Sequence, residues 1–199
     1  YVQTIDAGDP LYRQEQLHWA TDAVAYVRGK TYRRWVKTFL YRKSAAEMVA
    51  LVEQIVDDGQ TTFRVTLPIR FRHTQEGWCD ADLPFWQRET SHVVIKASHR
   101  RLLPLAAELS GRVEDAQQRL SALYGWRPQQ PVTLKLYGDP DWFRQSVKLT
   151  LPEWVGGWHE DGESIKLLVA GRRFLRPEAK PYYHSAVIHE MVHQMLAEL

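Results

Sequence analysis

The segment from Arg100 to Gly125 constrains the fold more than any other part of this chain. Its apolar residues recur at intervals of three and four, which is the spacing of one face of an α-helix. They are Leu102, Leu105, Ala106, Leu109, Val113, Ala116, Leu120 and Leu123. Gly125 provides a C-terminal stop for this helix. Strand-like segments precede it at residues 91–98 and follow it at residues 131–137, so this half of the chain is predicted to combine a helix with a sheet.

The beginning of the chain is also predicted to be helical. Asp9 followed by Pro10 is typical of a helix start, because an aspartate can cap the first free backbone N–H groups and a proline is tolerated in the first turn. An apolar stripe of roughly helical spacing follows, and Gly29 ends it. Residues 9–29 are therefore predicted to form the first helix.

Alternating segments follow that helix up to about residue 75. Residues 31–43 alternate so that four of them are expected on one face of a strand, namely Trp35, Lys37, Phe39 and Tyr41. Residues 47–56 and 61–73 flank the sequence Asp-Asp-Gly-Gln, a predicted hairpin turn. A helix followed by an antiparallel sheet is consistent with an α+β domain of the NTF2-like kind. We take residues 1–90 as this first domain, of unknown role, and residues 91–199 as the second.

The second domain continues with a short predicted helix at residues 139–146. Two strands are predicted within residues 154–169, and the turn between them has the sequence Glu-Asp-Gly-Glu. Between the two tryptophans of this stretch, Gly156 and Gly157 indicate a bulge or a close approach of another part of the chain. A last helix is expected to begin at Pro181.

Composition excludes several classes of protein. The net charge of the 199 residues is only +2, and the short arginine-rich stretches are scattered, which argues against nucleic acid as a partner. Cys79 is the single cysteine, so neither an internal disulfide nor a cysteine-rich structural zinc site can form, and no neighbouring histidine supports a nucleophilic role for it. No apolar run approaches the roughly 20 residues that a membrane-spanning helix needs.

The chemistry is concentrated in the last helix, which contains the sequence H-E-x-x-H at residues 189–193. His189 and His193 are four residues apart, so they lie about 40° apart around a helix and can bind one metal ion together. Glu190 lies about 100° from His189 and beside such a metal, where its carboxylate can accept a proton from water. A stripe formed by Ile188, Val192, Met195, Leu196 and Leu199 is expected to be buried next to the histidines.

A catalytic zinc usually has three protein ligands and one water, and the third ligand is not evident from the sequence. Glu198 falls about 140° from His193 around the helix and is rejected. The metzincin pattern needs a histidine six residues after His193, where the chain has Leu199. Candidate ligands that precede His189 in the sequence remain. His184 lies on the same helix but points to another side of it. The remaining candidates lie in a turn, and the chain would have to fold back in an unusual way to bring them to the metal; they are His159, Glu160, Asp161 and Glu163.

Residues from about 92 to 199 resemble the peptidase MA-like gluzincin domain, the thermolysin-like fold of zinc metallopeptidases. The likeness rests on the order of elements, on the H-E-x-x-H helix, and on the stretches "LYGDPDWFR" and "GGWHEDGESIKL". It implies a zincin-like mixed sheet with a long helix and an active-site helix. It also implies His189 and His193 as Zn²⁺ ligands and Glu190 as general base, and it favours an extracytoplasmic or secreted location.

The resemblance also predicts where a substrate would bind and what the chain lacks. The stretch containing Ile165, Lys166 and Leu167 is expected to be the edge strand, which would pair with an extended peptide through backbone hydrogen bonds. The family places its third ligand, a glutamate, on the helix that follows H-E-x-x-H, so this ligand is expected beyond Leu199. The sequence therefore predicts a zinc metallopeptidase that acts on peptides or proteins. The alternative is a gluzincin-like binding module without activity.

Overall fold

The computed structural model describes residues 4–169 and 180–199, and the chain divides into two compact units. The first unit comprises Tyr1–Pro84 and Arg144–Leu151, and the second comprises Phe85–Phe143 and Pro152–Leu199. The described residues form an α+β structure with four α-helices, one antiparallel sheet and one mixed sheet. None of the helices described is long and apolar enough to cross a membrane. The arginine-rich stretch at residues 170–176 lies outside the described part.

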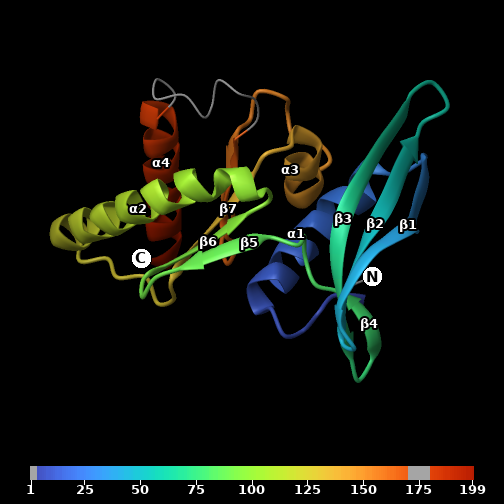
Figure 1. The fold of residues 1–199 in the computed structure, drawn as a ribbon. Helices are drawn as coiled ribbons and strands as arrows, with labels where there is room; N and C mark the ends of the chain where they lie inside the picture. Colours follow the sequence, from blue (N-terminus) through green and yellow to red (C-terminus); the bar gives the residue numbers. More distant parts are fainter. Residues whose placement is uncertain (1–3, 170–179) are drawn as a thin grey trace. The chain divides into compact units, whose positions relative to one another are not determined.

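The first unit contains helix α1 (Pro10–Tyr26) and a four-stranded antiparallel sheet (Figure 1). As predicted, Asp9 caps the helix, and its Oδ1 accepts a hydrogen bond of 3.0 Å from the backbone N–H of Tyr12. The sheet has the order β1-β2-β3-β4. Its strands are β1 (Thr31–Ser44), β2 (Glu47–Asp57), β3 (Thr62–Thr74) and β4 (Gly77–Asp80). The predicted hairpin between β2 and β3 is confirmed, with Asp57 opposite Thr62.

The predicted common face of β1 is wrong in one respect. Phe39 lies opposite Ala50 and Tyr41 lies opposite Val49, and these two partners are neighbours on β2. Adjacent residues of a strand point to opposite faces, so Ala50 and Val49 do. Phe39 and Tyr41 lie opposite these two residues and therefore also point to opposite faces of the sheet. The reason is a register shift between them, one of three irregularities along β1. Alternation in the sequence does not reveal such bulges.

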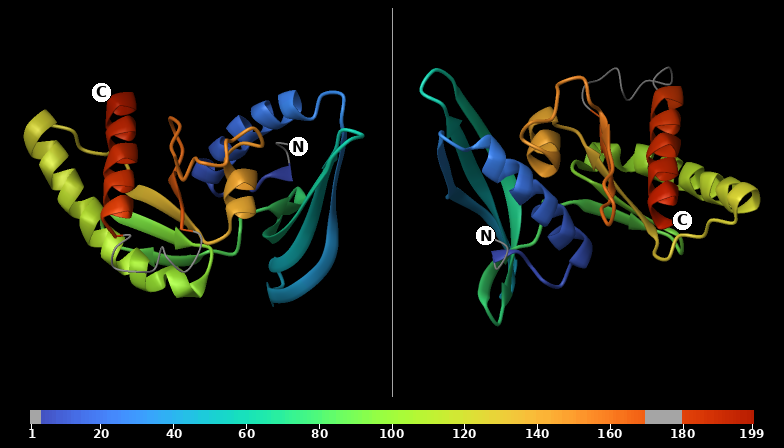
Figure 2. Two further views of the ribbon diagram at one scale, coloured as in Figure 1. Left: turned by 90° about the horizontal axis from the view of Figure 1, so that it is seen from above. Right: turned by 180° about the vertical axis from the view of Figure 1, so that it is seen from behind.

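The second unit is built on a five-stranded mixed sheet of order β5-β6-β7-β9-β8 (Figure 2). Strands β6, β7 and β9 are parallel, while β5 and β8 pair antiparallel at the two edges. The strands are β5 (Trp86–Glu89), β6 (Val93–Ala97), β7 (Val132–Tyr137), β8 (Gly157–Trp158) and β9 (Ile165–Leu168). Strand β5 belongs to this sheet, so the second unit begins a few residues before the predicted boundary at residue 90.

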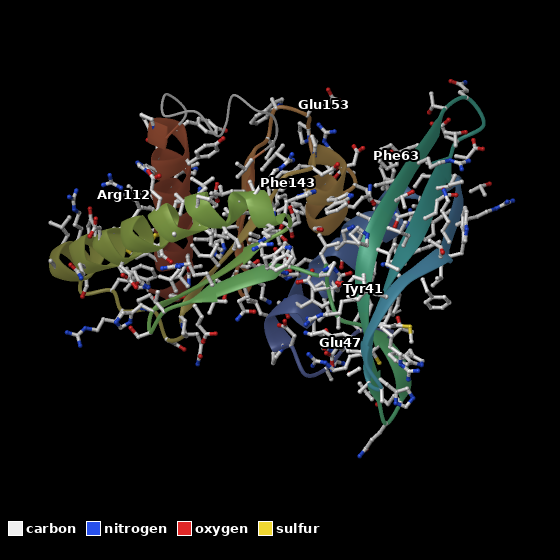
Figure 3. The ribbon with its side chains drawn as sticks, in the orientation of Figure 1. Tyr41, Glu47, Phe63, Arg112, Phe143 and Glu153 are labelled. Carbon is white, nitrogen blue, oxygen red and sulfur yellow. The ribbon has the colours of Figure 1, made fainter. Side chains whose placement is uncertain are left out.

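Two helices supply the apolar core of this unit. The predicted long helix is α2 (Leu103–Tyr124), preceded by the 3₁₀ turn η2 (Arg100–Leu102) and ended by Gly125 in a left-handed conformation. Helix α4 (Lys180–Glu198) carries the H-E-x-x-H sequence. Both pack apolar residues into one cluster with β6, β7 and β9, so they cover the same face of the sheet. Arg112 extends from the other, exposed side of α2 (Figure 3).

Helix α3 (Pro140–Val147) crosses the boundary between the units, because its first turn is assigned to the second unit and its last turn to the first. The return of residues 144–151 to the first unit was not predicted from the sequence. Within the first unit this segment is tied to α1 and β2. The Leu149 N–H donates to Asp22 at 2.8 Å, and the side chains of Gln54 and Gln145 are hydrogen-bonded.

The predicted edge strand is wrong. Strand β9, which contains Ile165, Lys166 and Leu167, lies between β7 and β8, and each of these three residues is about 1% exposed. Its backbone is therefore paired on both sides and cannot receive a peptide strand. The edge on this side is β8, which the sequence indicated only as the first strand of a hairpin. Strand order depends on contacts that are distant in sequence, and the local pattern of residues 165–168 carries no information about it.

Candidate metal centre

Helix α4 presents its two histidines on its exposed side. The Nε2 atoms of His189 and His193 are 3.1 Å apart, and both residues are exposed. The buried side of the helix is formed by Val187, Met191 and Met195, which belong to the core cluster. This differs from the predicted stripe, of which only Met195 is fully buried. Ile188, Leu196 and Leu199 are 44%, 65% and 75% exposed, while Val192 is half-buried against the core.

The spacing of the two ring nitrogens fits a shared metal ion. Two nitrogens that each lie about 2.0–2.1 Å from one tetrahedral Zn²⁺ are about 3.3 Å apart. The observed 3.1 Å is close to this value, so both rings could bind one ion with little rearrangement. The same distance also allows one neutral ring to donate a hydrogen bond to the other. The geometry thus accommodates zinc without requiring it.

Glu190 lies beside the histidine pair and is 8% exposed. It makes no hydrogen bond or ion pair with any described residue. Burial raises the pKa of Glu190 above its ordinary value, and the positive charges of His189 and His193 partly oppose this shift. A carboxylate with a raised pKa is a better proton acceptor, which is the property that a general base needs.

The edge strand β8 comes very close to this carboxylate. A β-carbon at Gly157 would lie 2.8 Å from Oε1 of Glu190, and one at Gly156 would lie 3.0 Å from the hydroxyl oxygen of Tyr182. The close approach that the two glycines predicted is therefore confirmed. The lack of a side chain at residue 157 leaves room for the Glu190 carboxylate in its present position.

His159 follows β8 directly, and its ring lies within electrostatic range of His193. Both of its ring nitrogens are buried and have no hydrogen-bond partner among the described residues. Burial lowers the pKa of His159, and the charges of Lys166 and His193 lower it further. Neutral imidazole is the form that binds metals. His159 lies at the turn end of the hairpin formed by β8 and β9.

The other candidate ligands are engaged elsewhere or exposed. Glu163 forms a buried ion pair with Lys166, and His184 contacts Glu108 on α2 at 3.2 Å. Glu198 accepts hydrogen bonds from Trp126 Nε1 and from Gln194, both at 2.8 Å, which agrees with its rejection as a ligand. Asp161 is exposed in the turn between β8 and β9.

No complete set of three ligands is assembled around the pair. Within the second unit, the described residues include no third histidine, cysteine or carboxylate atom that lies within 4.8 Å of both Nε2 atoms. The structure therefore brings together His189, His193 and Glu190, with His159 within electrostatic range of His193, but it does not place a third ligand in coordinating position.

Comparison of the chain with protein-family models, with curated proteins and with solved structures gives no match.

Proposed function

We propose that the second unit is a zinc-dependent peptidase of the gluzincin type, with His189 and His193 as metal ligands and Glu190 as the general base. The observation that carries this proposal is the combination of a histidine pair at metal-binding spacing with an adjacent buried carboxylate that has no hydrogen bond or ion pair to any described residue. Buried ionisable groups without a structural partner are concentrated at functional sites.

The roles of the residues follow from their surroundings. A zinc ion at the pair would make a water molecule acidic and polarise the substrate carbonyl. Glu190 would accept the proton from that water on a carboxylate oxygen and later deliver it to the leaving amine. The close contact with Gly157 limits the positions that this carboxylate can adopt, and the burial of Glu190 favours proton uptake.

A peptide substrate would extend the sheet at β8. This strand is the last one at its side of the sheet, and it approaches Glu190 on the helix of the histidine pair. Pairing of an extended peptide with a free strand edge supplies affinity through main-chain hydrogen bonds. We therefore propose β8 as the substrate contact in place of Ile165, Lys166 and Leu167, which lie on the inner strand β9.

The test is Glu190→Gln, which removes the base while retaining shape. Zinc content, measured by elemental analysis, should stay at that of the unaltered chain, and hydrolysis of a peptide library should fall by about 10²–10⁴-fold. Glu198→Gln is the matched control on the same helix and should leave hydrolysis unchanged. Hydrolysis that survives in the Glu190→Gln variant would exclude this role for Glu190.

The second candidate is a gluzincin-like module that binds a peptide without cleaving it. The observation in its favour is that the second unit lacks a third ligand in coordinating position. Zinc content separates the two candidates. A chain that contains no zinc after purification in its presence, yet binds peptides, would support the binding module and argue against the peptidase.

A further inference from the structure

The geometry points to His159 as the third protein ligand of the metal, in place of a glutamate on a later helix. This inference rests on the proposed metal site at His189 and His193. The starting observation is that both ring nitrogens of His159 are buried and have no hydrogen-bond partner among the described residues. A buried donor or acceptor without a partner costs about 1–3 kcal/mol, so a group in this state calls for a ligand or a water.

His159 lies one residue beyond β8, close to the part of the chain that approaches α4. An added β-carbon at Gly157 would lie 2.8 Å from a carboxylate oxygen of Glu190. His159 is two residues from Gly157, so the α-carbons of these two residues are at most about 7 Å apart. This short connection holds His159 in the neighbourhood of the helix that carries His189 and His193.

Electrostatics gives an independent sign of this proximity. The charge of His193 lowers the pKa of the His159 ring, so the two rings lie within electrostatic range of each other. The histidine side chain has two rotatable bonds. Coordination requires a rotation about them that brings an Nδ1 or Nε2 atom into coordinating distance of the metal held by the pair. The resulting set of three histidines leaves one position open for water, which is the arrangement of a catalytic zinc site.

The competing explanation is that the His159 nitrogens bind only water. Metal affinity distinguishes the two. The chain is stripped of metal with a chelator and titrated with Zn²⁺ against a chromophoric competitor, and Co²⁺ absorption reports the coordination geometry. His159→Ala should weaken Zn²⁺ binding by about 100-fold or more and change the Co²⁺ spectrum, since loss of even an outer partner of a ligand costs 10–100-fold.

Controls make each outcome informative. His184→Ala changes a histidine of α4 that contacts Glu108 and should bind Zn²⁺ like the unaltered chain. His159→Gln retains bulk and polarity, so it distinguishes a lost ligand from a disturbed strand, and thermal unfolding verifies that each variant is folded. Unchanged affinity in both His159 variants, with affinity lost in His193→Ala, would overturn the inference and leave the proposed function intact. An unaltered chain without any zinc affinity would contradict both.

Discussion

Two glutamates of this chain are buried to a similar degree in opposite surroundings. Glu53, in the first unit, is 4% exposed and lies 2.8 Å from the ammonium of Lys37 and 3.2 Å from the guanidinium of Arg64. Glu190, in the second unit, is 8% exposed and makes no hydrogen bond or ion pair with any described residue. Burial alone therefore does not distinguish these two carboxylates; the absence of a partner among the described residues does, and it is the reason for proposing a functional role for Glu190.

Two other buried carboxylates of the first unit also have hydrogen-bond or ion-pair partners, as Glu53 does. Asp80 accepts hydrogen bonds from the hydroxyl of Tyr12 at 2.7 Å, from Arg34 at 2.9 Å and from the backbone N–H of Asp82 at 3.1 Å. Asp6 lies 2.7 Å from the guanidinium of Arg72. These groups connect α1 and the start of the chain to the sheet, so we interpret them as structural.

The largest expected effect is on stability, from Asp80→Ala. The change leaves Tyr12 and Arg34 without their shared acceptor, and breaking such a buried network should lower the free energy of unfolding by about 3 kcal/mol. Urea denaturation measures it. Glu76→Ala, at an exposed position of the adjacent β3–β4 turn, should change stability by less than about 0.5 kcal/mol. Equal effects of the two substitutions would show that Asp80 is not structural.

A smaller effect is expected on catalysis, from Gly157→Ala. The added carbon would meet the Glu190 carboxylate at 2.8 Å and force it to shift. A displacement of this size should reduce peptide hydrolysis by about tenfold or more, with zinc content retained. The measurement is kcat/KM together with elemental analysis.

Gly111→Ala is the matched control for that change. Gly111 is exposed on α2, and an added β-carbon there meets nothing within 4 Å. Alanine should therefore raise the free energy of unfolding by about 0.5–1 kcal/mol through helix propensity and leave hydrolysis unaltered. If Gly157→Ala were as active as Gly111→Ala, the contact between β8 and Glu190 would have no role in positioning the base.

The comparison of the units also shows what the sequence can predict. Features with a local cause were predicted: the cap at Asp9, the turn at residues 57–60 and the stop at Gly125 depend on neighbours within a few residues. The faces of β1 were not, because bulges depend on the partner strand. Nor was the buried side of α4, since apolar residues surround most of this helix and tertiary packing selects Val187 and Met191.

The candidate site divides in the same way. The positions of His189, Glu190 and His193 relative to one another follow from helix geometry, so the sequence predicted them. The approach of Gly157 and the position of His159 depend on the pairing of β8 with β9 and on the packing of α4 against both. The sequence supplied His159 as a candidate, and only the fold shows that its ring is buried and within electrostatic range of His193.

The smallest expected effect is on the pH dependence of stability, and it has opposite signs for the two glutamates. Hydrogen bonding from Lys37, with smaller contributions from the charges of Lys37 and Arg64, holds the pKa of Glu53 below its ordinary value. The folded state therefore binds this proton less tightly than the unfolded state. The stabilisation is present above the ordinary pKa and is lost as the pH falls through the lowered one.

Glu190 behaves in the reverse manner, because burial raises its pKa in the folded state. The stability associated with its bound proton is full below the ordinary pKa and is lost as the pH rises through the raised one. Urea denaturation of the chelator-treated chain from about pH 3 to pH 8 covers both transitions. Glu53→Gln should reduce stability at neutral pH, and this deficit should shrink toward acid. Glu190→Gln should match the stability of the unaltered chain in acid and become more stable than it as the pH rises. If stability changed with pH in the same way in both variants, the two carboxylates would not differ as their surroundings indicate.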